Sequence, residues 1–190
     1  MKKSLFTNLL ALGVVGAFVI GCKGSKDIAA PKGEVEIVVP CSGPDFFTTS
    51  KAFRSNSIGE SSDQVTSKKK ALTNARNELA ASIQTTVKTV TDSYVNSREF
   101  NNKEELEERF ESLNREVVNQ KLSGITTICE KLVRTGEGRY KTYIAIELSA
   151  EDLVSEYNER MSKDDRLKID YDYEKFKETF NAEMDKMSNN

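Results

Sequence analysis

The chain has 190 residues, of which 37% are hydrophobic and 31% charged, with a formal net charge of -2. This composition permits one modest hydrophobic core and lacks the basic footprint of nucleic-acid-binding proteins. The sequence contains no histidine, which excludes Ser-His-Asp and Cys-His catalysis, histidine zinc ligands and histidine pH switches built from this chain alone. We therefore expect a noncatalytic protein that holds no cofactor and no metal.

The first residues have the layout of an export signal that ends in a lipidated cysteine. Two lysines precede an apolar run over residues 5–20, and this run is shorter than the about 20 apolar residues that a membrane-spanning helix needs. The four residues from Val19 to Cys22 resemble a lipobox, which implies cleavage after Gly21 and two or more acyl chains at Cys22, enough for stable anchoring. We predict a lipoprotein signal peptide over residues 1–21. The alternatives are a secreted protein with a chance cysteine or an uncleaved membrane anchor.

This signal predicts where the rest of the chain is held. Residues 22–33 are expected to form the lipid anchor and a flexible tether, because the segment behind the cysteine is small, polar and charged. Residues 34–190 then suit a single domain. Lys23, rather than an aspartate, follows the anchor cysteine, which is compatible with sorting to the outer membrane. We expect a lipid-anchored protein on the periplasmic face of that membrane, with surface display as the alternative.

Two short extended segments are predicted before the first helix. Residues 35–39 are rich in valine and isoleucine and are closed by Pro40, so they favour a strand. Residues 41–45 have strong turn chemistry, and residues 52–58 predict a second strand that stops before Gly59.

A long amphipathic helix over residues 64–95 is the clearest predicted element, with Ser62 or Asp63 as its N-cap. A second helix is expected to begin after Asn102, in a capping pattern with Glu105. The apolar side chains of the long helix recur at spacings of three, four and seven residues and are Leu72, Leu79, Ile83, Val87, Val90 and Tyr94.

Residues 125–133 and 140–148 predict a β-hairpin with one buried and one solvent-exposed face. Ser149 can cap the next helix, and a last amphipathic helix follows, so the C-terminal helical segment covers residues 150–187. The predicted fold class is α+β, with a long amphipathic helix packed on a small antiparallel sheet that contains the hairpin 125–148, and with additional C-terminal helices.

Several of these elements occur together in a recognisable order. The lipoprotein signal precedes a helix that contains Asn74 to Ala80, a strand that begins at residues 122–125, and the run from Gly138 to Ile146, which leads into a helix. Over about residues 53–153 this pattern resembles the lipoprotein-twenty family, the small Helicobacter-type outer-membrane lipoprotein antigen and its relatives. The resemblance implies an α+β domain on an outer-membrane protein. It implies no biochemical activity and no catalytic residues, and the C-terminal helix is not part of the pattern.

Cys41 and Cys129 are the cysteines that remain once Cys22 carries lipid. They are candidates for a disulfide, since compartments outside the inner membrane permit one. The alternative is two buried free thiols, because free cysteine packs as a small hydrophobe. The sequence leaves both open, because it does not say whether the two residues meet in space.

Two weaker patterns are more simply explained by solvated surface. Ser67 and Lys70 match the S-x-x-K spacing of penicillin-interacting enzymes, but no S-D-N or K-T-G partner is present. Acidic residues over 164–174 could gather calcium, yet their spacing is not that of an EF-hand loop.

The function class that best fits is a membrane-anchored envelope lipoprotein without catalysis, acting in a structural or protein-interaction role with other envelope proteins. One alternative is a carrier that holds a small apolar ligand between the long helix and the sheet. The last helix carries an aromatic stripe that either docks a partner protein or covers the core of its own domain. The residues of this stripe are Tyr173, Phe176, Phe180 and Met184.

Overall fold

The computed structural model describes residues 33, 36–97, 103–165 and 171–189, and Ile37–Asn190 make up one compact unit. The predicted signal peptide, the anchor Cys22 and nearly all of the predicted tether lie outside the described residues.

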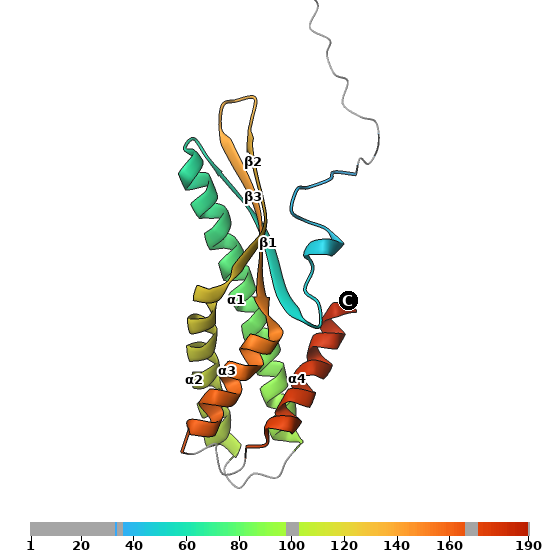
Figure 1. Cartoon of the computed structure of the whole chain (residues 1–190), viewed down its shortest axis with the longest axis vertical. Helices are drawn as coiled ribbons and strands as arrows, with labels where there is room; N and C mark the ends of the chain where they lie inside the picture. The colour runs from blue at the N-terminus through green and yellow to red at the C-terminus, as the bar shows by residue number, and fades with distance from the viewer. Residues whose placement is uncertain (1–32, 34–35, 98–102, 166–170, 190) are drawn as a thin grey trace, which may run out of the picture. The chain divides into compact units, whose positions relative to one another are not determined.

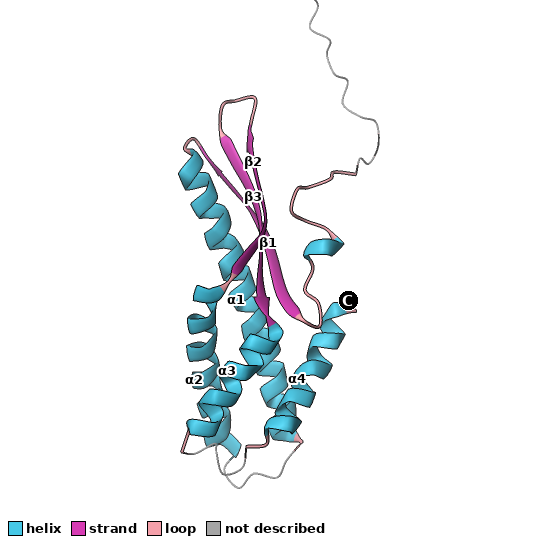
Figure 2. Cartoon of the chain, in the orientation of Figure 1, coloured by secondary structure: helices cyan, strands magenta, loops and turns pink. Residues whose placement is uncertain are grey.

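A three-stranded antiparallel sheet forms one layer of this unit (Figure 2). Its strands are β1 (Ala52–Ser61), β2 (Thr126–Arg134) and β3 (Tyr140–Ser149), in the order β1-β3-β2. The predicted hairpin is therefore confirmed as β2 and β3. The strand predicted over residues 52–58 is the third strand of the sheet, but it does not stop before Gly59, because pairing with β3 continues through Gly59 to Ser61. β3 lies in the middle, so within the described part of the chain β1 and β2 each have one edge without a neighbouring strand.

Four helices join the sheet in this unit and confirm the predicted α+β class. They are α1 (Gln64–Asn96), α2 (Lys103–Lys121), α3 (Ala150–Lys163) and α4 (Tyr173–Ser188), with short 3-10 turns η1 (Pro44–Phe46) and η2 (Leu122–Gly124).

Side-chain caps fix where the helices begin. The carboxylate of Asp63 accepts a 2.8 Å hydrogen bond from the Thr66 amide at the start of α1, which lowers the pKa of that carboxyl. The Ser149 hydroxyl accepts from the Asp152 amide, 3.2 Å away, at the start of α3. The cap Ser149 was predicted, and Asp63 is the one of the two predicted candidates, Ser62 and Asp63, that caps α1. The predicted cap Asn102 lies outside the described residues.

The N-terminal half of α1 packs against one face of β1 and β3, and its C-terminal half lies among the other helices (Figure 1). Apolar side chains from the two layers meet in a continuous core, because alternate residues of a strand point to the same face. Its fully buried members include Phe53 of β1, Leu79 and Ile83 of α1, and Ile144 and Ile146 of β3.

The predicted strand over residues 35–39 is wrong where the structure describes it. Residues 36–39 are irregular, and Ile37 and Val38 are 79% and 88% exposed. A strand needs a partner edge, and Thr48 instead occupies the edge of β1, where its hydroxyl lies 3.0 Å from the Arg54 amide and 3.2 Å from the Arg54 carbonyl oxygen. Strand propensity alone does not supply a pairing partner.

Candidate functional site

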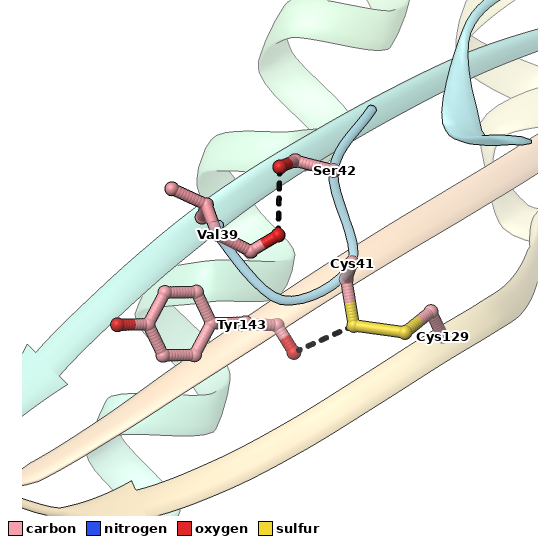
Figure 3. The surroundings of a disulfide bond; sticks show 5 residues. All are labelled: Val39, Cys41, Ser42, Cys129 and Tyr143. Atoms are coloured by element: carbon pink, nitrogen blue, oxygen red, sulfur yellow. Dashed lines mark hydrogen bonds between the residues drawn. A yellow bond between two sulfur atoms is a disulfide. The ribbon is translucent and has the colours of Figure 1, made fainter. Parts of the chain in front are cut away.

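The structure joins Cys41 and Cys129 in a disulfide, with the two Cα atoms 5.5 Å apart (Figure 3). Cys129 belongs to β2, whereas Cys41 lies in a tight turn in which the Ser42 hydroxyl donates to the Val39 carbonyl oxygen at 2.8 Å. The Cys41 sulfur is 3.7 Å from the Tyr143 carbonyl oxygen of β3. A bridged sulfur has no proton to donate, so this is a close approach in which the turn crosses β3 to reach β2.

The disulfide covers the sheet face opposite α1. Cys129 is the register partner of Ala145 in the middle strand, and Ala145 is fully buried although its face carries mostly polar residues. Cys41 itself is 5% exposed and has a φ of +56°, a left-handed conformation that costs free energy in a residue other than glycine. The covalent link holds this turn against the sheet.

A second attachment holds the same N-terminal segment two residues farther along β3. Arg54 of β1 forms a 2.7 Å ion pair with Glu147 of β3. The two residues are directly opposite each other in the pairing of these strands. The same guanidinium donates to the carbonyl oxygens of Asp45 and Phe47 around η1, at 3.2 and 3.4 Å. Residues 41–48 are thus fixed by one covalent and several polar contacts.

β2 is the most exposed strand of the sheet. All its residues except Cys129 are exposed, including the apolar Ile128, Leu132 and Val133 at 36%, 42% and 40%. Its register with β3 shifts between Thr127 and Cys129, which marks a β-bulge at Ile128. An exposed edge strand with apolar side chains is a typical site of strand pairing with another chain.

Charged side chains lie on β2 and on both faces of the rest of the sheet. Glu130 of β2 forms a 2.9 Å ion pair with Lys68 of α1, which places Glu130 on the face that α1 covers. The Arg134 guanidinium lies 5.8 Å from the centre of the Tyr140 ring, a cation–π arrangement. On the opposite face, Glu60 pairs with Arg139 at 2.6 Å and with Lys141 at 3.5 Å.

The S-x-x-K pair has a structural role. Ser67 is fully buried, and its hydroxyl donates to the Gly59 carbonyl oxygen at 2.9 Å and shares a 2.8 Å hydrogen bond with the Thr142 hydroxyl. Lys70 turns to the surface and donates to the Glu60 carbonyl oxygen at 3.3 Å. The serine is therefore part of the contact between α1 and the sheet and has no access to a substrate.

The acidic segment also serves the fold where it is described. Asp164 forms a 2.5 Å ion pair with Arg109 of α2, and Asp172 caps α4 by accepting from the Lys175 amide at 3.1 Å. Asp170 lies outside the described residues. Within the described ranges, no group of three or more acidic or cysteine side chains is arranged to hold a metal ion.

The aromatic stripe of the last helix covers the protein's own core. Phe176 and Met184 are fully buried and Phe180 is 1% exposed, while Tyr173 is partly buried against the same core. The Phe176 ring makes an edge contact with Tyr94 of α1, with ring centres 5.6 Å apart. Of the two alternatives, the one in which the stripe covers the domain's own core is therefore confirmed for Phe176, Phe180 and Met184, whose buried side chains offer no docking surface.

A buried polar chain ties three helices together below the sheet. The Tyr157 hydroxyl of α3 donates to the Asn114 side-chain oxygen of α2 at 2.5 Å, and the Asn114 amide donates to the Gln84 carbonyl oxygen of α1 at 3.4 Å. Burial raises the pKa of the Tyr157 phenol, so the hydroxyl remains a proton donor. This arrangement fixes helix positions and offers no activated nucleophile.

The space between α1 and the sheet is occupied by packed protein. A Cβ placed on Gly59 would lie only 2.2 Å from the Ser67 carbonyl oxygen, so helix and strand backbones touch at one end, and Leu79 and Ile146 fill the other. A cavity of about 600 Å³ lies instead between α1 and α2. Its lining is mainly charged and polar, so it does not suit the apolar ligand of the carrier hypothesis; it includes Lys88, Asp92, Glu104, Glu107, Glu111 and Arg115.

Among the residues that the structure describes, none of the helices combines the length and apolar content that crossing a bilayer requires. Comparisons of this chain with protein-family models, with curated proteins and with solved structures find no match. The resemblance to the lipoprotein-twenty family therefore stays a prediction.

Proposed function

We propose that this chain is an exported envelope lipoprotein, anchored by acyl chains on Cys22, that works without catalysis through contacts with other envelope proteins. Outer-membrane anchoring on the periplasmic face and kinship with the lipoprotein-twenty family are parts of the same proposal. It requires that residues 1–21 are removed and that the domain folds outside the cytoplasm.

The observation that carries the proposal is the disulfide between Cys41 and Cys129. Structural disulfides form and persist in oxidising compartments and are rare in the reducing cytosol. A bridge 88 positions apart in sequence, together with an export signal that ends in a cysteine, supports the same destination. Neither feature depends on the other, since one concerns the folded domain and the other the segment before it.

A role in protein contact is supported by what the surface offers. The sequence has no histidine, and Ser67, the serine of the S-x-x-K spacing, is fully buried. The exposed strand β2 presents backbone donors and acceptors that no strand among the described residues occupies on its outer side. Such an edge suits recognition of an extended polypeptide better than it suits chemistry.

Metabolic labelling with an alkyne-bearing fatty acid in the native cells tests the anchor. The unaltered chain should carry the label and sediment with membranes, and Cys22→Ser should lose the label. Cys41→Ser is the matched control, because it removes another cysteine of the same chain and should keep the label. An unlabelled wild-type chain, or one found in the soluble fraction, would overturn the proposed anchoring.

Separation of inner from outer membranes by density then tests the destination. The proposal expects the labelled chain in the outer-membrane fraction and protected from added protease in intact cells. Cleavage in intact cells would place the domain on the cell surface instead.

A further inference from the structure

The outer edge of β2 has the features of a strand-pairing site. β3 occupies one side of β2, and no strand of the described chain lies on its other side. The bulge at Ile128 twists the strand before Cys129, so the regular part of the free edge runs from Cys129 to Arg134. Within this part Leu132 and Val133 expose apolar side chains, and Glu130, Lys131 and Arg134 supply charges.

We infer that this edge pairs antiparallel with the same edge of a second copy of the chain, with Leu132 on the two-fold axis. In an antiparallel pair, opposed residues direct their backbone groups either both toward each other or both away. Every second residue of β2 already uses its backbone N–H and C=O groups to pair with β3. A residue of one copy can therefore lie opposite only the same residue of the second copy, or a residue an even number of positions away. The axis must therefore pass between two copies of the same residue.

Charge selects among these registers. Centring on Glu130, Lys131 or Arg134 opposes two side chains of like charge, which is destabilising. Centring on Val133 opposes the two valines but sets Leu132 against Arg134 and Lys131 against Thr135, so it forms no opposite-charge pair. Centring on Leu132 opposes the two leucines and sets Glu130 of each copy against Arg134 of the other. Both of these opposite-charge pairs lie on the face that α1 covers, as the Lys68–Glu130 ion pair shows.

Nothing described in the chain blocks this edge. α1 packs mainly on β1 and β3, and the turn that carries Cys41 crosses the other face of the sheet over β3, near Tyr143 (Figure 3). A pairing centred on Leu132 opposes only residues 130–134 of each copy. Because so short an interface is smaller than that of most stable dimers, the expected association is reversible and is best captured by crosslinking.

Site-directed crosslinking of the purified full chain tests the register. Opposed Cα atoms in an antiparallel pair are about 4.5–5.5 Å apart, within the range of a disulfide, so Leu132→Cys should give a covalent dimer on mild oxidation. Val133→Cys is the matched control, because Val133 is next in the chain and as exposed, at 40% against 42%. Its two copies would be about 8 Å apart, too far for a bridge.

Charge reversal in the Leu132→Cys background tests the pairing itself. Glu130→Arg or Arg134→Glu alone should reduce the dimer roughly fivefold, since each creates two like-charge pairs, and the double exchange should restore it. Glu130 also forms an ion pair with Lys68 of its own chain. Lys68→Ala removes that ion pair alone and should leave the amount of dimer unchanged. Mass spectrometry of the linked peptides, and unchanged thermal unfolding, show that the native Cys41–Cys129 bridge is intact in each variant.

The outcomes separate cleanly. A dimer at Leu132 that is weak or absent at Val133, and that the double exchange restores, supports the pairing. Equal crosslinking at both positions, no crosslinking at Leu132, or no recovery in the double exchange would overturn it. Because the purified chain is oxidised in solution, none of these results depends on where the protein is located in the cell.

Discussion

Gly59 of β1 and Ser67 of α1 are in direct contact: the Ser67 hydroxyl donates to the Gly59 carbonyl oxygen at 2.9 Å. A Cβ on Gly59 would lie 2.2 Å from the Ser67 carbonyl oxygen and 2.4 Å from the Ala71 amide nitrogen, so only glycine permits this approach. The short connection between β1 and α1 thus folds the helix back onto its own strand, backbone against backbone. This contact sets the distance between helix and sheet.

Gly59→Ala should destabilise the protein by about 3 kcal/mol, because overpacking against backbone atoms forces the helix away from the strand. The measurement is the free energy of unfolding of the full chain in denaturant. Gly136→Ala is the control, since Gly136 has no neighbour within 4 Å of an added Cβ, and its effect should stay within about 0.5 kcal/mol. Equal effects at the two positions would contradict the close approach.

Local sequence patterns predicted the elements of the fold well. The spacing of Leu79, Ile83 and Val87 carries the period of a helix face, and Asp63 has the side chain that a helix start requires, so both were visible without a structure. The hairpin followed in the same way from its alternating second strand. These features depend on residues close in sequence, for which pattern and structure are directly linked.

Features that depend on residues distant in sequence were harder to predict from the sequence. The sequence left the pairing of Cys41 with Cys129 open, because strand order decides whether residues 88 positions apart come together. Likewise, the burial of Phe176 depends on α1 and α3, and the exposure of β2 depends on its place at the edge of the sheet. A strand such as β2, with charged and apolar residues on both faces, gives only a weak sign that it lies at an edge.

Removal of the disulfide should lower the stability of the folded domain. The Cys41→Ser/Cys129→Ser double variant is expected to lose about 4 kcal/mol in the chain-entropy model for a loop of this length. Amide hydrogen exchange should rise over residues 39–43, because the turn loses its covalent attachment to β2, while exchange in α1 changes less. The unfolding free energy and hydrogen exchange by mass spectrometry are the two measurements.

A reducing agent supplies the control for the disulfide variant. It should destabilise the unaltered chain by a similar amount and leave the double variant unaffected. If reduction changed neither stability nor exchange in the unaltered chain, the bridge would not hold the N-terminal segment in solution.

Phe176→Ala tests whether the stripe on α4 is core. The ring is fully buried and contacts Tyr94 and Tyr157, so truncation should cost about 3–5 kcal/mol of unfolding free energy. Tyr173→Ala, on the same helix but only partly buried, should cost about 1 kcal/mol. Unchanged stability in Phe176→Ala would contradict its burial and revive the stripe as a binding surface.

Glu156 should make stability depend on pH in the acid range. Its carboxylate accepts from Arg160 at 3.0 Å and pairs with Lys121 of α2 at 3.2 Å. The hydrogen bond from Arg160 lowers the pKa of Glu156 below its ordinary 4.5, and Lys121 lowers it further. Together they outweigh burial, which raises this pKa. The unfolded chain therefore binds the proton more readily, so this stabilisation is present above pH 4.5 and is lost as the pH falls through the lowered value.

Glu156→Gln should accordingly lower the unfolding free energy at neutral pH and flatten its decline between about pH 5 and pH 3, the range of ordinary and lowered carboxyl pKa values. The measurement is denaturant unfolding across this range. Glu159→Gln is the control on the same helix, because its partner Lys163 is 71% exposed and exposed ion pairs contribute little. If both variants kept the slope of the unaltered chain, the link between α3 and α2 through Glu156 would not contribute to acid stability.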